Sequence, residues 1–173
     1  TTPADNWDYT ATQDIALADM EIDGAVRKVL LQAPKNGFFY VIDRSTGDLL
    51  RAHKYVPTTW ATHVDMETGR PVENTAYAYA DEPKWIVPGP LGGHNWQAMS
   101  VDVDAGVVYL PTHQSALTYA LDEAWKADGS YGRVPGQWAL GIEFERLSEI
   151  LVETPDAPKP FGRLIAFDPV TGT

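Results

Sequence analysis

Alternating apolar and polar residues, separated by short turn signals, dominate the chain and are typical of β-strands. The segment 26–32 has an apolar centre, and the tight-turn dipeptide Asp23-Gly24 lies just before it. The apolar segment 38–42 predicts a second strand, and residues 49 and 50 begin a third. Later strands are predicted at 99–101, 107–110 and 164–167. The pattern therefore predicts an all-β chain.

Four predicted turns share the form Asp-x-x-x-Gly, at 43–47, 65–69, 102–106 and 168–172. In such a turn the Asp carboxylate accepts backbone N–H groups two or three residues on, and Gly adopts a positive φ without a steric clash. Similar turns at irregular spacing indicate a repeated β unit and favour a propeller whose blades carry insertions. An antiparallel sandwich with similar turns is the alternative.

Helix signals are sparse and are confined to 116–125 and 142–152, where we predict the helices of this chain. The proline-rich stretches 83–90 and 155–160 are predicted to be loops, and neither has the length of a domain linker.

Charge and composition exclude several classes of protein. The 173 residues carry 13 Lys and Arg against 24 Asp and Glu, a formal net charge of −11, which argues against a nucleic-acid partner. An aromatic content of 11% argues against disorder. Because cysteine is absent, these residues hold no disulfide, thiolate zinc site or Cys-x-x-Cys-His haem attachment. No apolar run approaches the roughly 20 residues that cross a bilayer, so no transmembrane segment is predicted.

Two charged side chains lie where chemistry is often placed. Asp8 stands between Trp7 and Tyr9, and partial desolvation by two such rings would raise a carboxyl pKa and suit it to act as a base. The alternative is an exposed Asp at a fraying terminus. Lys35 lies in a Pro-x-x-Gly turn between two predicted strands, which would place its ammonium at a strand end. The alternative is a solvated turn lysine.

A glycine-rich segment at 88–97 is the third candidate site. Its glycines allow close approach to a planar ligand, while Asn95 offers an amide and Trp96 a stacking surface. The alternative is a loop with a packing tryptophan. The four histidines show no metal-ligand spacing and are predicted to lie on the surface or in loops. Dinucleotide-binding, P-loop and serine-hydrolase motifs are absent from the sequence.

Three segments together resemble the pyrroloquinoline quinone (PQQ) dependent alcohol dehydrogenases. They read WDYTATQ at 7–13, LQAPKNGFFYVIDR at 31–44 and PGPLGGHNW at 88–96, in the family's order and approximate spacing. The resemblance implies an eight-bladed β-propeller, of which residues 1–173 would be part of a single domain. We therefore expect a partial propeller of several four-stranded antiparallel blades, cut from a longer protein and inactive alone.

The resemblance also implies roles for individual residues. Asp8 matches the base that takes the proton of an alcohol hydroxyl while hydride passes to the quinone, and it is a possible calcium ligand. Lys35 matches the cation that binds the quinone oxygens, and Asn95 and Trp96 match residues beside the cofactor. Lanthanide-using relatives carry a second Asp two residues after the base; Thr10 stands there, which implies the calcium type.

The implied protein oxidises primary alcohols to aldehydes in the periplasm, with PQQ and calcium as cofactors. Its implied partners are a small alcohol, a cytochrome or haem electron acceptor, and the remaining propeller segments. Haem c is expected only outside these residues. A non-catalytic propeller that serves as a scaffold or binding module is the alternative; it would need the turns but not the combination of Asp8, Lys35 and Asn95.

Overall fold

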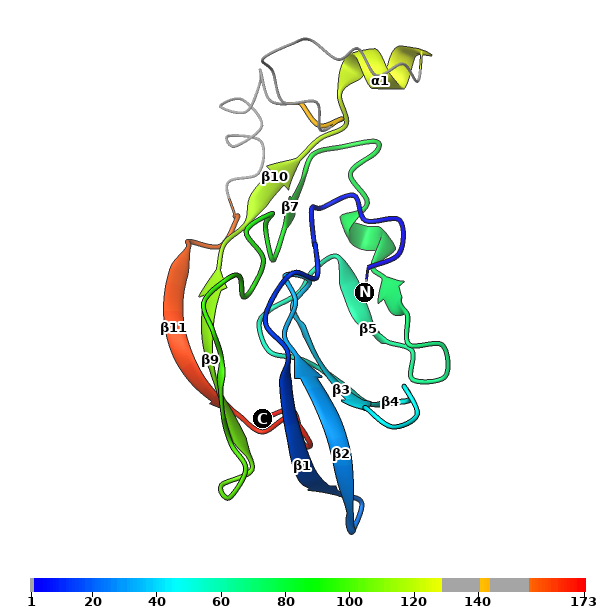
Figure 1. Cartoon of the computed structure of the whole chain (residues 1–173). Helices are drawn as coiled ribbons and strands as arrows, with labels where there is room; N and C mark the ends of the chain where they lie inside the picture. The colour runs from blue at the N-terminus through cyan, green and yellow to red at the C-terminus, as the bar shows by residue number, and fades with distance from the viewer. Residues whose placement is uncertain (1, 129–140, 144–155) are drawn as a thin grey trace.

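The computed structural model describes residues 2–128, 141–143 and 156–173. Short antiparallel strands account for nearly all of its regular structure (Figure 1). The elements are β1 (Ala16–Ile22), β2 (Ala25–Gln32), β3 (Phe38–Asp43), β4 (Leu49–Lys54), β5 (Ala61–Val64), β6 (Pro71–Glu73), the 3-10 helix η1 (Thr75–Tyr77), β7 (Lys84–Ile86), β8 (Ser100–Asp102), β9 (Val107–Gln114), β10 (Leu117–Tyr119), α1 (Glu123–Asp128) and β11 (Phe161–Phe167).

The first sheet, in the order β1-β2-β3-β4, is antiparallel throughout. Its strand β3 is covered on both faces because its side chains alternate between two hydrophobic cores. Phe39 and Val41 lie in one core, and Phe38 and Tyr40 lie in the other. Burial of each large apolar side chain stabilises the fold by about 1.5–3 kcal/mol. A sheet covered on both faces is expected for a blade that stands between two neighbours.

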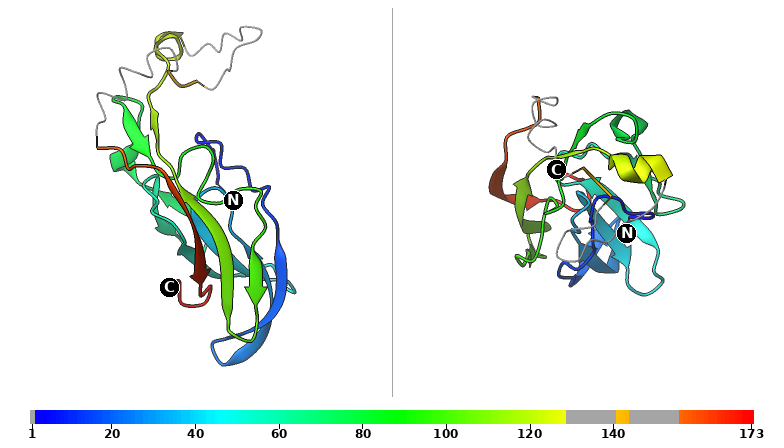
Figure 2. Two further views of the ribbon diagram at one scale, coloured as in Figure 1. Left: turned by 90° about the vertical axis from the view of Figure 1, so that its left-hand side faces the viewer. Right: turned by 90° about the horizontal axis from the view of Figure 1, so that it is seen from above.

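The first core joins this sheet to a second one, in the order β11-β9-β8. Leu31 and Phe39 of the first sheet share this core with Val108, Leu110 and Phe167 of the second. The Phe39 and Phe167 ring centroids are 5.2 Å apart. Figures 1 and 2 show the second sheet alongside the first, as successive blades would stand.

The second core covers the other face of the first sheet. The segment before β1, the hairpin β5-β6 and the pair β7-β10 all contribute to it. Trp60 lies at its centre, with ring centroids 4.8 Å from Trp7, 5.4 Å from Tyr9 and 6.0 Å from Phe38. Buried rings therefore fix the irregular N-terminal segment to the sheet.

All four Asp-x-x-x-Gly segments form the predicted turns. In each, backbone N–H groups two or three residues on donate to the Asp carboxylate at 2.8–3.1 Å. The closing glycine has φ between 68° and 85° in every case. These turns were predictable because each depends on contacts within five residues.

Two predictions of local structure are wrong. The predicted helix 116–125 contains the strand β10, and α1 begins only at Glu123. Leu117 of β10 pairs with Ile86 of β7, and β7 itself lies inside the predicted loop 83–90. Pairing between these two distant segments overrides the local preference of each. Strands β1, β5 and β6 were not predicted.

Of the other predicted helix, 142–152, only residues 142 and 143 are described, and Ile142 forms a β-bridge with Leu121. The predicted loop 155–160 is irregular over its described residues 156–160. No helix in the described ranges is long and apolar enough to cross a membrane.

Candidate functional site

Asp8 and Lys35 form an ion pair that joins the first two candidate segments. The Lys35 ammonium donates to the Asp8 backbone oxygen at 3.0 Å and to its carboxylate Oδ2 at 3.2 Å. The two side chains differ in exposure, since 11% of the Lys35 side chain is accessible against 62% of that of Asp8. The pairing thus brings a mostly covered cation against an accessible carboxylate.

The prediction that Trp7 and Tyr9 desolvate Asp8 is wrong for the described chain. Both rings are buried in the second core, and the side chain between them is mostly exposed.

The backbone of Asp8 adopts an unusual conformation for a residue with a side chain. Its φ is 67°, in the left-handed region, which costs a non-glycine residue on the order of 1–3 kcal/mol. Asp5 supports this geometry. Its Oδ1 accepts the N–H of Trp7 at 2.9 Å and its Oδ2 accepts the N–H of Tyr9 at 2.6 Å. Sequence reasoning missed Asp5, although Asp commonly binds backbone N–H groups a few residues on.

Two tyrosine hydroxyls fix the same segment from other elements. Tyr119 of β10 donates to the Trp7 backbone oxygen at 3.2 Å, and the Tyr9 hydroxyl donates to the backbone oxygen of Pro88. Burial raises the pKa of both hydroxyls, and nearby tyrosine and aspartate groups, Asp5 among them, raise it further. Both therefore stay protonated and available as donors.

The turn that carries Lys35 is held by an unbroken series of hydrogen bonds to its backbone oxygens. Each carbonyl from residue 33 to residue 36 accepts a donor from a distant part of the chain. The donors, in that order, are His94 Nδ1 at 2.8 Å, Tyr55 Oη at 2.6 Å, Gly93 N at 3.0 Å and Trp60 Nε1 at 2.8 Å. The backbone of Lys35 is therefore fixed on both sides of its side chain.

The glycine-rich third segment packs directly on this turn. A Cβ on Gly92, whose φ is 80°, would lie 2.5 Å from Cα and Cβ of Lys35. This close approach explains the glycine. The segment's two predicted site residues lie differently: the Asn95 amide donates to the Leu91 backbone oxygen at 2.9 Å, and 82% of Trp96 is exposed. The three segments thus meet, whereas the cofactor contacts of Asn95 and Trp96 stay predictions.

His94 lies in a loop, one of the two predicted locations, but the prediction did not foresee its burial. It is fully buried, and its ring nitrogens lie 2.8 Å from the Ala33 oxygen and 2.5 Å from the Gln97 oxygen, so it ties the glycine-rich loop to the Lys35 turn. Burial, and then the charge of His94, lower the pKa of the neighbouring His113. Within the described ranges, His, Asp and Glu side chains form no group of three that could hold a metal ion.

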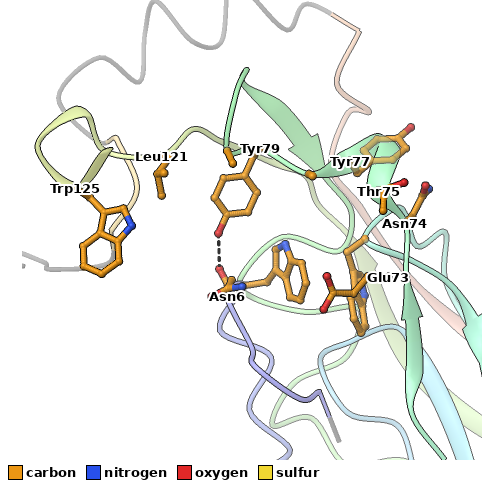
Figure 3. A pocket seen from close by; sticks show the side chains of 12 residues that line it. Asn6, Glu73, Asn74, Thr75, Tyr77, Tyr79, Leu121 and Trp125 are labelled. Carbon is orange, nitrogen blue, oxygen red and sulfur yellow. Dashed lines mark hydrogen bonds between the residues drawn. The ribbon is translucent and has the colours of Figure 1, made fainter. Parts of the chain in front are cut away.

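A pocket of about 350 Å³ opens beside the residues that precede Asp8 (Figure 3). Asn6 and Trp7 form one side, and Tyr79, Leu121 and Trp125 line it from other segments. The Tyr79 hydroxyl donates to the Asn6 backbone oxygen at 3.2 Å, the dashed line in Figure 3. Five of the twelve lining residues are aromatic, and the pocket borders the segment that carries Asp8.

Comparison with known proteins identifies the family. Residues 1–68 match the β-propeller domain of the PQQ-dependent glucose, ethanol and alcohol dehydrogenases. The chain is 46% identical over 170 residues to 1-butanol dehydrogenase (cytochrome c) of Thauera butanivorans, and 43% identical over 169 residues to quinohemoprotein alcohol dehydrogenase of Comamonas testosteroni. Each match covers 98% of this chain but only 24% and 23% of those relatives.

Solved structures agree. The structure of quinohemoprotein alcohol dehydrogenase ADH-IIG from Pseudomonas putida superposes with a TM-score of 0.82 at 43% identity, over 100% of this chain and 25% of that one. The predicted fold, an incomplete propeller built of antiparallel sheets, is thereby confirmed. The chain belongs to the PQQ-dependent alcohol dehydrogenase family and spans about a quarter of the length of the relatives it matches.

Proposed function

We propose that this chain supplies the proton acceptor and a cofactor-binding cation to a PQQ- and calcium-dependent dehydrogenase of primary alcohols. The observation that carries the proposal is the contact between Asp8 and Lys35, at 3.2 Å between Oδ2 and Nζ. It places a carboxylate that can take a proton beside an ammonium that can bind an electron-rich oxygen. The activity belongs to the whole protein, of which these residues are one part.

The donors present fit a quinone that carries carbonyl and carboxylate oxygens. An ammonium has three N–H groups, and in the described chain two of those of Lys35 meet oxygens of Asp8. The third is available to a quinone oxygen. Because the Lys35 ammonium is already held by two oxygens of Asp8 on a fixed backbone, little side-chain freedom is lost when a ligand binds.

Calcium fits these residues only in part. The ion takes about six to eight oxygen ligands. Among the described residues, Asp8 is the carboxylate that we propose as one ligand, and no further His, Asp or Glu completes a cluster with it. The remaining ligands are proposed to come from outside the described residues.

The proposed chemistry divides one oxidation between two groups. When bound, PQQ supplies the quinone that accepts a hydride from the alcohol carbon. A carboxylate oxygen of Asp8 takes the hydroxyl proton, and the aldehyde remains. Lys35 orients this carboxylate and binds the quinone oxygens, which favours negative charge there. Asn95 and Trp96 are proposed to line the cofactor site.

Residues 1–173 are proposed to form part of one propeller domain. The wider setting is also a proposal: a periplasmic enzyme that passes its electrons to a cytochrome or to a haem outside this chain. The names of the relatives, a cytochrome c-linked 1-butanol dehydrogenase and quinohemoproteins, support that choice of acceptor. No observation favours the non-catalytic scaffold.

The test uses the full-length protein that carries these residues, reconstituted with PQQ and calcium. Asp8→Asn should lower alcohol-dependent dye reduction by about 10²–10⁴-fold while the protein still binds PQQ. Asp19→Asn is the matched control, because Asp19 forms a 3.0 Å ion pair with Arg44 elsewhere on the first sheet. Unchanged turnover in Asp8→Asn, or no alcohol-dependent reduction by the parent protein, would overturn the proposal.

A further inference from the structure

We propose that Asp5 is a positioning residue for Asp8, a role that rests on the proposed function. The Asp5 carboxylate accepts a hydrogen bond on each side of Asp8, the proposed base. One oxygen accepts the N–H of the residue before Asp8, and the other accepts the N–H of the residue after it. Both oxygens of the carboxylate are thus engaged on the backbone. Asp5 itself is exposed, so burial does not account for its presence.

The two bonds fix the conformation on which the Lys35 contact depends. With φ at 67°, the backbone of Asp8 turns its own carbonyl oxygen and its carboxylate toward the same ammonium. A residue released from this conformation would relax toward negative φ, which non-glycine residues prefer. Either the carbonyl or the carboxylate contact with Lys35 would then be lost.

Comparison with the chain's other aspartate-centred turns shows what is different here. At residues 43, 65, 102 and 168 an Asp carboxylate also accepts local N–H groups, but a glycine occupies the left-handed position. Near Asp5 the left-handed position is Asp8 itself, which must keep its carboxylate to act as a base. Glycine would remove that carboxylate, so the strain of the left-handed conformation is offset by other bonds. Asp5 accepts both of these bonds.

Tyr119 makes the same segment rigid from a second direction, through its bond to the Trp7 oxygen. That bond lies on the side before Asp8. Among the contacts described, the N–H of Tyr9, on the side after Asp8, is held by Asp5. Loss of the Asp5 carboxylate therefore leaves the segment attached to the core through Trp7 and the buried Tyr9 ring, but it removes the acceptor of the Tyr9 N–H that supports the left-handed conformation of Asp8.

The test compares Asp5→Asn and Asp5→Ala in the full-length protein loaded with PQQ and calcium. Asn keeps one acceptor oxygen and Ala keeps none. We expect kcat per bound PQQ to fall about 10-fold in Asp5→Asn and about 100-fold in Asp5→Ala, the scale of small misplacements of a catalytic group. The KM for alcohol and the amount of bound PQQ should change less than about twofold.

Asp65→Asn is the matched control, because Asp65 accepts two backbone N–H groups, at 2.8 and 2.9 Å, in a turn closed by Gly69. It should keep the kcat of the parent protein. If Asp5→Ala does not fold, Asp5→Asn decides. Equal kcat in the Asp5 and Asp65 variants overturns the proposal, as does a fall in activity that only follows a fall in bound PQQ. Failure of the proposed function is separate, because there Asp8→Asn itself keeps its turnover.

Discussion

Substitution of Gly92 tests whether close packing of the glycine-rich loop holds Lys35 in position. In Gly92→Ala the new Cβ would lie 2.5 Å from Cα and Cβ of Lys35 and 2.6 Å from its Cγ. Ordinary contact is at about 3.5 Å, so one of the two segments must move by about 1 Å. The left-handed φ of 80° adds about 1–2 kcal/mol for any residue with a side chain. Overpacking adds about 1–3 kcal/mol, which gives a total of about 2–5 kcal/mol.

Gly47→Ala is the matched control for this substitution. Gly47 has a similar φ of 85°, but a Cβ there meets nothing within 4 Å. It should therefore show the backbone cost alone, about 1–2 kcal/mol. Both variants are made in the full-length protein and compared by denaturant unfolding, PQQ binding and alcohol-dependent turnover. A shift of Lys35 by about 1 Å should lower turnover of Gly92→Ala about 100-fold. Equal stability and turnover in the two variants would refute the reasoning.

Two further predictions concern buried groups around the Lys35 turn. Trp60→Phe removes the donor to the Asn36 backbone oxygen, 2.8 Å away, and should lower the free energy of unfolding in denaturant by about 2–4 kcal/mol. Trp96→Phe is the control: because Trp96 is exposed, its loss should cost less than about 0.5 kcal/mol. Burial raises the pKa of Tyr40 to about 12, against a bond from Asn36 that lowers it. The raised pKa means that the fold favours the protonated Tyr40 hydroxyl, and this stabilisation is complete below pH 10 and lost as the pH rises toward 12. Tyr40→Phe should therefore reduce the fall in unfolding free energy over this pH range. An unchanged slope would contradict the assignment to Tyr40.

Features set by local contacts were predictable from the sequence. The aspartate-glycine turns need only a carboxylate, nearby N–H groups and a residue that tolerates positive φ, and all of these lie within five positions. The strand β3 was equally clear, because its apolar run is buried on both faces. The strands β7 and β10 were not, because each has three residues and exists through pairing with the other.

The candidate site likewise has parts that local sequence predicts and parts that depend on distant segments. Residue type and resemblance pointed to Asp8 and Lys35, and the structure brings them together across 27 positions of sequence. The supports of the Lys35 turn could not be predicted, because His94 and Trp60 reach it from distant segments. Asp5 is the exception, since its bonds are local: its carboxylate accepts N–H groups two and four residues further along the chain, a pattern that is typical of Asp.

A crystal structure of the full-length protein with PQQ bound tests the roles of Asp8 and Lys35 most directly. Lys35 Nζ should lie within hydrogen-bond distance of a quinone oxygen, about 2.7–3.2 Å, while the Asp8 carboxylate faces the cofactor. The contact of Asp8 with Lys35 should persist. A cofactor bound away from both side chains would contradict the proposed roles.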